Sequence, residues 1–465
     1  MNNKVAPTPP PGLHIETRCI EQIPLDERHG KAWHLAPFWF TGNSVLTTLV
    51  AGFVGPAMGL GVRHSIIAIL IGVGLGTLCL ALHANQGPRL GLPQMIQSRT
   101  QFGRRGATLP LLAAIFVYLG LNVFNTVLAT DAISSLLPGP DARWFAVLLG
   151  AAMLMAMAGH DLLLSVQRWL TYLLIGVFGV LSLAALLLLE ADTAQRSIAF
   201  YWPAFFVQLA AAAGYQLGYT VYASDYSRYL PASTPARSVI VWTFLGAAGA
   251  ACWLMSLGAL LASAIHGPDA IASLQQLGNR FLPGFGSFAV LASVPALVGI
   301  MALNCYGAAL AGISALSGFI ALQPGLRARL VGIALAALCS YGISLWLPTG
   351  YLDSFNAFLL LMLYFLIPWS AINLTDFYLL RRHSPTPERN WAWPGLLAYL
   401  GGWLGMLPFL SLGLYEGAMV EVLDGADIAF LVGFAVSALL YAALMRLDAG
   451  WRVPASPARH DSFHR

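Results

Sequence analysis

Residues 201–231 constrain this chain more than any other segment. They read YWPAFFVQLAAAAGYQLGYTVYASDYSRYLP, an apolar run that can cross a bilayer, since a spanning helix needs about 20 residues. Two glycines and the polar Tyr215, Gln216 and Tyr219 interrupt the run at mid-depth. Lipid cannot satisfy backbone groups at such an interruption, so a break is tolerated only where it lines a protein cavity. The segment therefore predicts a broken helix at a transporter binding site.

The composition excludes a soluble protein. Hydrophobic residues make up 58% of the chain, charged residues only 9%, and the mean hydropathy is +0.71. A soluble domain carries about 25% charged residues. The five cysteines lie apart, without the spacing of a metal or redox site: Cys19, Cys79, Cys252, Cys305 and Cys339. These features predict a polytopic membrane protein without a bound metal or cofactor.

Apolar runs of spanning length predict an all-α protein with twelve transmembrane helices. One run, 288–318, is too long for a simple crossing and predicts either a tilted helix or an interfacial end. The predicted spans are 35–57, 64–83, 108–130, 143–159, 168–189, 201–222, 239–264, 288–318, 329–347, 355–378, 393–413 and 427–446.

Basic residues near the helix ends predict the orientation. Twelve spans place both termini on one side, which then holds twenty of the 24 Lys and Arg residues; the other side holds Arg63, Arg143, Arg196 and Arg280. This bias accounts for the net charge of +4 without invoking nucleic acid. We expect both termini in the cytoplasm and the chain in the cell inner membrane, with no cleavable signal peptide in its polar, Pro-rich N-terminal segment.

The first predicted span carries a break like that of the sixth, at Thr41-Gly42-Asn43 and again at Gly52 and Gly55. First and sixth are corresponding positions in two five-helix units, and an odd helix number inverts the second unit. The alternative is that the glycines serve close helix packing. The predicted organisation is a 1–34 cytoplasmic arm, repeats at 35–190 and 201–380, two further helices in 393–446 and a 447–465 cytoplasmic tail.

Polar side chains inside spans are costly and point to function. Tyr118 and Asn122 share one helix face at i,i+4, so an aromatic ring lies one turn from an amide. That pair suits a flat heteroaromatic ligand, because an amide both donates and accepts hydrogen bonds. The alternative for Asn122 is a bond to a neighbouring helix. Asn304 lies in the apolar run ALNCYGAALAGIS and favours a ligand contact over a cross-helix bond.

Four other polar or special residues predict structural or gating roles. Asp225 and Arg228 follow the sixth span, Pro368 predicts a kink in the tenth, and Asp376 is positioned to pair with Arg381 or Arg382. The sequence contains no HExxH, P-loop, GxSxG or clustered His/Cys motif, and its apolar segments hold no carboxylate pair spaced for acid–base chemistry. We therefore expect no enzymatic activity.

Four stretches together match motifs of one transporter family. They are GPRLGLPQMIQSRTQFG at 87–103, SDYSRYLP at 224–231, IPWSAI at 367–372 with Asp376-Phe377-Tyr378 and Arg381, and TGN at 41–43 with GFVGPAMGLG at 52–61. Between about residue 20 and residue 382, the chain resembles the nucleobase:cation symporter-1 family, in its purine–cytosine permease branch. The resemblance implies a twelve-helix fold with a five-plus-five inverted repeat, and import of a nucleobase or related heterocycle driven by Na⁺ or H⁺.

The resemblance also implies a substrate site. The family's stacking aromatic falls on Tyr118, where tryptophan is more usual, and its helix-three amide on Asn122. Its contacts on the sixth and eighth spans fall on Tyr215, Gln216 and Asn304. Two residues at the interruption of the first span complete the predicted substrate-binding set: Phe40 and Asn43.

The eighth span differs from that of sodium-coupled relatives, which resemble one another in carrying hydroxyls one turn before the asparagine. Residues 296–303 read ALVGIMAL and contain no hydroxyl. A hard cation prefers several oxygen ligands. The sequence therefore favours H⁺ as coupling ion, with Na⁺ on backbone carbonyls of Phe40, Thr41 and the eighth span as the alternative.

The sequence as a whole predicts a secondary transporter that imports cytosine, a purine, uracil or a related heterocycle by proton symport with alternating access. Its predicted partners are the substrate and the lipid bilayer. One alternative is an amino-acid or amine transporter of the same fold, and another is a Na⁺-coupled importer of allantoin, a hydantoin or a thiamine precursor. A sensor or channel-like protein without coupled transport is a third. The sequence does not specify the oligomeric state.

Overall fold

The computed structural model describes residues 21–158, 160–189, 200–265, 269–320, 325–347, 351–380, 389–412 and 415–447. Nine helices in these ranges are long and apolar enough to cross a membrane. They are α4 (Val62–Ala84), α8 (Thr108–Ser134), α9 (Asp141–Ala158), α10 (His160–Leu188), α13 (Ala236–Ala264), α15 (Phe285–Leu316), α16 (Leu326–Ser344), α17 (Tyr351–Thr375) and α20 (Ala429–Leu447).

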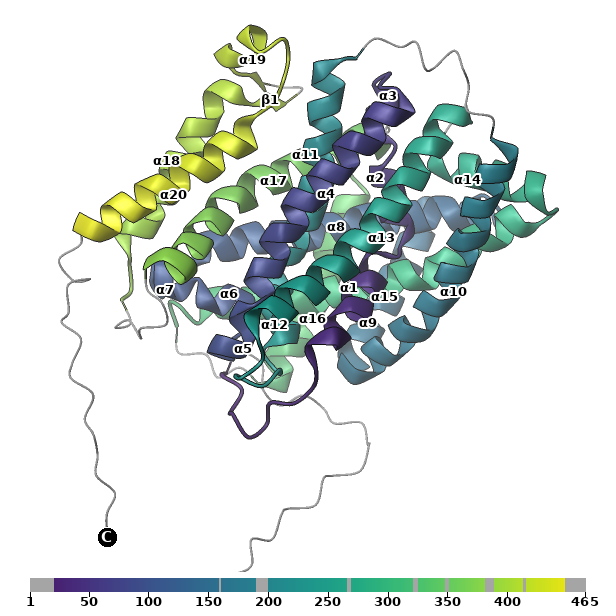
Figure 1. The fold of residues 1–465 in the computed structure, drawn as a ribbon. Coiled ribbons are helices and arrows are strands. Elements are labelled where there is room, and N and C mark those ends of the chain that lie inside the picture. Colours follow the sequence, from purple (N-terminus) through teal and green to yellow (C-terminus); the bar gives the residue numbers. More distant parts are fainter. Residues whose placement is uncertain are drawn as a thin grey trace, which may run out of the picture.

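Three further predicted spans correspond to shorter helical pieces (Figure 1). The first span consists of α1 (Leu35–Asn43), α2 (Leu46–Ala51) and α3 (Val54–Ala57). The sixth consists of α11 (Trp202–Gly218), a 3-10 turn (Tyr219–Tyr222) and α12 (Ala223–Ser227), and the eleventh is α18 (Trp393–Met406). The broken spans are therefore the first and the sixth, as a five-plus-five repeat requires.

The position of the break in the sixth span differs from the prediction. The helix α11 continues through Gly214 and Gly218 and changes to a 3-10 turn only at Tyr219. Glycine costs a helix only about 1 kcal/mol relative to alanine, so it does not force an interruption. A Cβ on Gly214 would lie 2.6 Å from the carbonyl oxygen of Leu359 in α17. Close helix packing, the alternative considered for these glycines, is therefore their role.

Glycines also allow the first span to approach α13. A Cβ on Gly52 would lie 1.9 Å from the carbonyl oxygen of Met255, and a Cβ on Gly258 would lie 1.9 Å from that of Leu49. The two backbones are thus in direct contact, a small-residue packing that membrane helices commonly use. The first span breaks at Ser44, directly after the predicted Thr41-Gly42-Asn43 interruption, and again at Gly52, where α2 has ended and α3 has not begun.

Side chains of the sixth span satisfy backbone groups that the broken first span exposes. The Gln208 amide accepts a hydrogen bond from the Gly55 N–H at 2.7 Å and donates one to the Ala51 carbonyl at 3.1 Å. The Tyr219 hydroxyl donates to the Gly42 carbonyl at 2.9 Å. The two broken spans therefore hold each other, without water or lipid being needed at these three groups.

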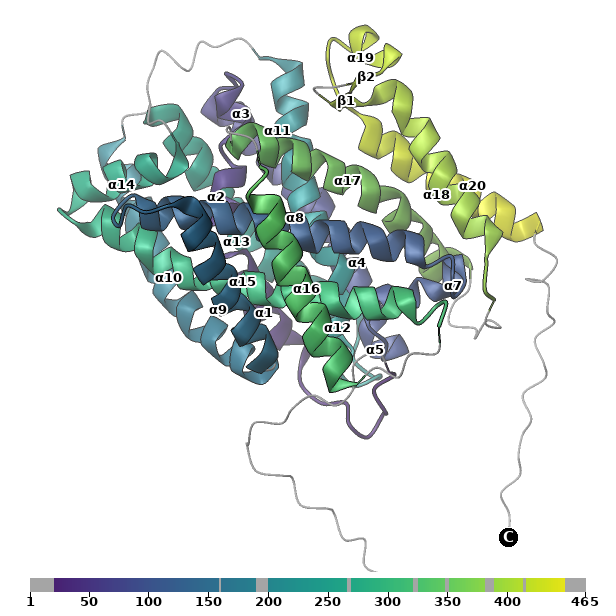
Figure 2. The ribbon, with the colours of Figure 1, turned by 180° about the vertical axis from the view of Figure 1, so that it is seen from behind.

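The helix α14 (Ala270–Phe281), a small hairpin and the short helix α19 (Ala418–Val422) lie between spans and were not predicted. The helix α14 is amphipathic, is capped by Asp269, and packs against α10 and α15 at the periphery (Figure 2). A search for apolar runs of about 20 residues overlooks such a helix. The hairpin, β1 (Ser411–Leu412) with β2 (Tyr415–Glu416), and α19 precede α20.

Two long helices extend beyond their predicted spans. The helix α10 begins at His160, earlier than the predicted residue 168, although its apolar part starts at Trp169. The long eighth span is one helix, α15, of 32 residues. That length corresponds to about 48 Å at 1.5 Å per residue, more than a bilayer core requires.

The outer helices α18 and α20 lie along α17 at one edge of the molecule (Figure 1). Two tyrosine–carboxylate pairs join α17 and α20, and the tyrosine belongs to α17 in one pair and to α20 in the other. Tyr364 of α17 donates to Asp427, whose other contacts are the N–H groups of Ser411 and Ala429 at 2.9 Å. Near the other end, Tyr441 of α20 donates to Asp376 at 2.9 Å. Burial raises the pKa of Asp427, which lies before α20, while its three donors oppose that shift.

The chain before α1 packs against two loops. Arg28 is buried and donates to the carbonyls of Ile23 and Pro88 at 3.0 and 2.8 Å, and the His29 N–H donates to the Tyr229 carbonyl. Residues 21–34 therefore tie the loop after the second span to the loop after the sixth. The predicted arm at 1–20 and tail at 448–465 lie outside the described residues.

We predict that Gly52→Ala lowers stability by about 1–3 kcal/mol, the usual effect of overfilling a packed site. The added methyl would collide with backbone, which cannot move aside as a flexible side chain can. Gly74→Ala is the matched control, because no heavy atom lies within 4 Å of its Cβ position in α4. Thermal unfolding of purified protein in detergent measures both. Equal melting temperatures for the two variants would contradict the close contact.

Candidate functional site

Two asparagines on neighbouring helices each hold one unpartnered polar atom. Asn304 of α15 and Asn122 of α8 are buried, and neither the Nδ2 of Asn304 nor the Oδ1 of Asn122 has a hydrogen-bond partner among the described residues. The Nδ2 of Asn122 donates to the Cys305 sulfur at 3.1 Å, so the asparagines belong to one contact between α8 and α15. A buried unpaired polar group is costly. Together they offer one donor and one acceptor to a ligand.

Tyr118 lies one turn from Asn122 on α8, as the sequence predicts. Its ring packs against Gly307 of α15: a Cβ there would lie 2.6 Å from the ring carbon Cζ. Any side chain at 307 would therefore displace the tyrosine. The structure thus brings Tyr118, Asn122 and Asn304 to the same α8–α15 contact.

A row of aromatic rings extends from Tyr118 to the first span. Tyr222 stacks on Tyr118 with centroids 5.9 Å apart and on Trp39 with centroids 6.0 Å apart, at interplanar angles of 21° and 18°. The edge of Tyr226 contacts both Trp39 and Tyr222. These three residues were not predicted as site residues. Tyrosine spacing at 215, 219, 222 and 226 is a helical-face pattern that would have indicated Tyr222 and Tyr226.

A partly open cavity, with about 430 Å³ of empty space including the solvent at its mouth, adjoins Tyr118 and this row. It is lined by Tyr118, Tyr222, Asp225, Tyr226, Arg228, Leu303, Tyr306, Gly307 and Leu310. A second cavity of about 300 Å³ shares Tyr118, Asp225, Gly307 and Leu310, and reaches Pro93 and Met95 of the loop after α4. The cavities therefore extend from Tyr118, the ring predicted to stack on the ligand, toward the end of the molecule that carries α5 (Gln86–Leu90) and α12 (Figure 1).

Asn43 and Gln216, both predicted to contact substrate, are bonded to each other. The Gln216 Nε2 donates to the Asn43 Oδ1 at 2.7 Å, and its Oε1 accepts from Thr77 of α4 at 3.3 Å. The Asn43 Nδ2 donates to the Trp39 carbonyl at 3.0 Å. Both amides thus use their donor and acceptor groups inside the protein, where they join the first, second and sixth spans.

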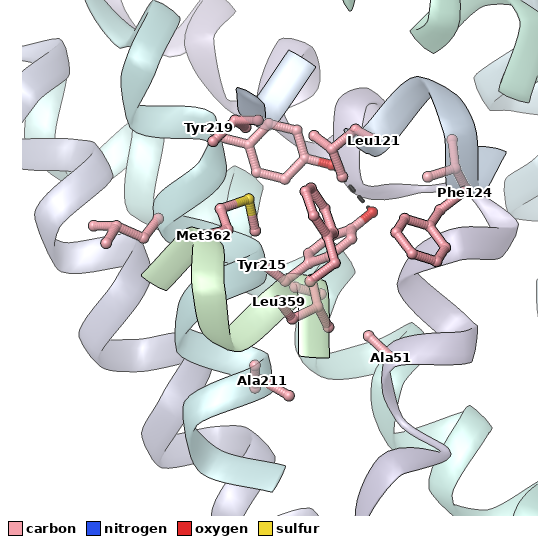
Figure 3. Close-up of a cluster of buried hydrophobic side chains, with 14 of the residues drawn as sticks. Ala51, Leu121, Phe124, Ala211, Tyr215, Tyr219, Leu359 and Met362 are labelled. Atoms are coloured by element: carbon pink, nitrogen blue, oxygen red, sulfur yellow. Dashed lines mark hydrogen bonds between the residues drawn. The ribbon is translucent and has the colours of Figure 1, made fainter. Parts of the chain in front are cut away.

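Tyr215 takes part in a second internal network. Its hydroxyl lies 2.8 Å from the Thr48 hydroxyl and 3.3 Å from that of Tyr219. Figure 3 shows both tyrosine rings beside Leu121, Phe124 and Met362. Phe40 stacks on Trp253 of α13 at 6.2 Å and does not line either cavity described above. In this conformation, Tyr215 and Phe40 are therefore packed within the protein.

The predicted gating residues lie around the cavities and at the helix ends. Asp225 and Arg228 line the larger cavity, and Asp225 accepts from the Gln94 N–H at 2.7 Å. Pro368 lies inside a helix that remains continuous to Thr375. Asp376 begins a π-helical turn and accepts from Gln101 at 2.8 Å as well as from Tyr441. Its predicted partners Arg381 and Arg382 lie outside the described residues.

A third cavity of about 210 Å³ lies at the break of the first span. Thr41, Ser44, Thr171, Ala296 and Ile300 are among its lining residues, so three hydroxyl-bearing residues of the first and fifth spans line it. The Thr41 and Ser44 hydroxyls donate to the Pro37 and Phe40 carbonyls. The sequence prediction rested on the eighth span and overlooked them. However, the Phe40 and Thr41 carbonyls already accept hydrogen bonds from Ser44, through its hydroxyl at 2.8 Å and its N–H at 3.1 Å. A cation there would compete with these bonds.

Comparisons with known proteins agree on one family. The family model described as permease for cytosine/purines, uracil, thiamine, allantoin matches residues 22–433. The Bacillus subtilis protein YxlA, whose name places it with the purine–cytosine permeases, is 36% identical over 93% of this chain and 96% of its own length. The purine–cytosine permease FCY21 of Saccharomyces cerevisiae is 25% identical over 92% of this chain and 86% of its own.

A solved structure shows the same fold. It is Mhp1, a nucleobase-cation-symport-1 family transporter, in a closed conformation with bromovinylhydantoin bound. The TM-score is 0.71 at 16% identity, covering 94% of this chain and 96% of Mhp1. The predicted all-α polytopic membrane fold and the predicted family are confirmed.

We predict that Asn304→Ala abolishes heterocycle binding and leaves the folded protein intact. A site built around a hydrogen bond loses much of its affinity when one partner is removed. The substitution also removes an unpaired buried donor, so the melting temperature should stay the same or rise. Gln216→Ala is the contrast: it breaks two internal hydrogen bonds and should lower the melting temperature. Radioligand binding and thermal unfolding of both variants measure these effects. Normal binding by Asn304→Ala would reject the assignment.

We predict that Tyr118 supplies the stacking surface for the ligand. Tyr118→Phe should retain affinity, whereas Tyr118→Ala should weaken it by about 1–3 kcal/mol, roughly 5–150-fold in Kd. Dissociation constants for both variants measure the difference. Tyr415→Ala, at an exposed position near α19, controls for general effects of losing a tyrosine. Equal affinities of the Ala and Phe variants at position 118 would show that the ring is no platform.

Proposed function

This chain belongs to the family of permeases for cytosine, purines, uracil, thiamine and allantoin, and on that basis we propose that it imports a nucleobase or a closely related flat heterocycle. The family consists of transporters, so the chain is a multi-pass membrane transporter and not an enzyme. The substrate crosses the membrane unchanged, and the residues act by binding it and by moving around it.

The observation that carries the proposed substrate class is the pair of unpartnered amide atoms beside an aromatic ring. The Asn304 Nδ2 and the Asn122 Oδ1 together offer a donor and an acceptor. A nucleobase edge presents complementary groups, and its ring suits stacking on Tyr118. Stacking tolerates several ring systems, which agrees with a family that transports several heterocycles.

We further propose that the end carrying α5 and α12 faces the cytoplasm and that the chain lies in the cell inner membrane. Twenty of the 24 basic residues support this orientation. The two larger cavities then extend from Tyr118 toward the cytoplasm; Asp225 lines both, and Arg228 lines the larger one. Substrate would leave by this route after release from the asparagines.

The movement that exposes the site alternately to each side follows from the contacts between spans. Asn43, Gln216 and Thr77 join the first, sixth and second spans by side-chain hydrogen bonds, while α8 and α15 carry the ligand-binding asparagines. We propose that the first group rocks against the second, as in transporters built from inverted repeats. The aromatic row of Trp39, Tyr222 and Tyr118 lies across that boundary and would separate during the movement.

Protons are the coupling ion that the described residues favour. Residues 296–303 offer no side-chain oxygen, and the Phe40 and Thr41 carbonyls are already hydrogen-bonded. Sodium remains the second candidate, because three hydroxyl-bearing residues line the 210 Å³ cavity. A competition experiment distinguishes both kinds of nucleobase importer from an amino-acid or amine transporter of the same fold. Nucleobases should block uptake, and amino acids should not.

We predict that accumulation in proteoliposomes follows an inward pH gradient and persists in sodium-free buffer. One proton per neutral substrate would allow about tenfold accumulation per pH unit, since each tenfold step corresponds to about 1.4 kcal/mol. A protonophore should abolish it. A panel of cytosine, purines, uracil, allantoin and hydantoin under separate pH and Na⁺ gradients measures substrate and ion together. Strict dependence on Na⁺ without a response to pH would contradict proton coupling, and no accumulation in any gradient would favour a channel-like protein.

A further inference from the structure

A buried histidine that none of the roles above uses lies near the end of α4. His83 has no exposed surface. Its ring nitrogen Nδ1 lies 2.8 Å from the carbonyl oxygen of Cys79, one turn earlier in α4. Its other ring nitrogen, Nε2, is buried and has no hydrogen-bond partner among the described residues. Ring nitrogens in such surroundings are normally paired, so this one requires an explanation.

The contact with Cys79 determines what Nε2 can do. A carbonyl oxygen only accepts hydrogen bonds, so Nδ1 must carry the proton. In the neutral ring, Nε2 then holds the lone pair and is the basic atom. His83 therefore presents a proton acceptor that is fixed in orientation and not already occupied.

An aromatic face lies against this imidazole. The ring of Trp369 in α17 stacks on it with centroids 4.9 Å apart and an interplanar angle of 25°. The Trp369 Nε1 donates to the Ser98 hydroxyl at 2.9 Å, which holds the indole in place. The face of an indole attracts a cation, so the stack would stabilise the protonated imidazolium more than the neutral ring.

Ser224 lies between the His83 backbone and Gln94, and its hydroxyl can donate its one proton to either of them. The Ser224 hydroxyl lies 3.0 Å from the His83 carbonyl and 2.7 Å from the Oε1 of Gln94. The backbone N–H of Gln94 donates to Asp225, which lines both larger cavities. The backbone of α4 at His83 is therefore close to Asp225, which lines the proposed substrate route.

Other titratable or charged groups near this end of α4 have different partners. The Tyr378 hydroxyl donates to the Leu82 carbonyl and accepts from Asn85, both at 2.9 Å, and Asp225 accepts from Gln94. Arg89 of α5 is exposed, and Cys79 contributes its carbonyl. Within the described residues, none of these groups is hydrogen-bonded to Nε2.

We propose that the Nε2 of His83 binds the coupling proton. This inference rests on the proposed proton-driven import and identifies the group that carries the proton. A hydronium ion transfers its proton to Nε2: an O–H bond breaks, an N–H bond forms, and water remains. His83 lies at the α5 end of α4, which we place toward the cytoplasm, so a proton from the outer solution must first pass through the interior of the protein. On the inner side, the reverse transfer to water restores the neutral ring.

The stack with Trp369 would connect protonation to movement. Trp369 follows Pro368, which has no backbone N–H and so leaves α17 without one helical hydrogen bond. The helix can therefore bend there at lower cost than elsewhere. Bending would separate Trp369 from His83 and expose Nε2 to water. In the conformation described here, Nε2 is buried.

Two substitutions test the proton site. His83→Asn keeps a side-chain donor for the Cys79 carbonyl, and His83→Phe keeps a ring against Trp369, while both remove the basic Nε2. We expect each to retain substrate counterflow within about twofold of wild type. Accumulation in a pH gradient should fall to onefold, and substrate-driven proton entry, followed with an internal pH dye, should be lost. His64→Asn, at a half-buried position on the opposite end of α4, is the matched control and should behave as wild type.

The outcomes separate this inference from the proposed function. If the wild-type protein shows no response to a pH gradient, the proposed proton coupling fails. If the wild type responds and the His83 variants still carry protons with substrate, the assignment to His83 is overturned. Should both variants lose counterflow, Trp369→Leu decides: loss of the aromatic face should move the pH of half-maximal uptake downward, and an unchanged pH profile would reject the proposal.

Discussion

The structure depends on one constraint: backbone groups that leave a helix inside a membrane must find partners in the protein. The first span leaves helical geometry at Ser44, and the sixth becomes a 3-10 turn at Tyr219. Gln208 and Tyr219 bond the Ala51 and Gly42 carbonyls and the Gly55 N–H. Each broken span is thus stable only beside the other, and their pairing fixes where a cavity can form.

The amides near the breaks fall into two classes with different consequences. Asn43 and Gln216 satisfy each other, so they hold spans together and leave little for a ligand. Asn122 and Asn304 each retain one atom without a hydrogen-bond partner among the described residues. Under the proposed function, a ligand that supplies the partner would recover the free energy that this costs. Satisfaction of hydrogen bonds therefore separates residues that build the site from residues positioned to bind within it.

The outer helices complete the arrangement by holding α17. Its two tyrosine–carboxylate contacts with the α20 region flank Pro368: Tyr364 lies near the middle of α17, and Asp376 lies directly after its end. The segment between these contacts carries Pro368 and Trp369, next to His83, and is where we propose that α17 bends. Helices eleven and twelve thus contribute to the core of the transporter, although they lie outside the repeat.

The sequence alone determined the membrane class, the twelve spans, the breaks in the first and sixth, and the family. Apolar length and the placement of basic residues are local properties, and they need no knowledge of the fold. It also identified Tyr118, Asn122 and Asn304, because an isolated polar residue in an apolar run is visible without coordinates. The roles of Gly52, Gly214, Gln208 and His83 could not be read in this way. Each depends on which backbone or ring lies opposite, and only the packing of distant helices decides whether a buried polar atom finds a partner.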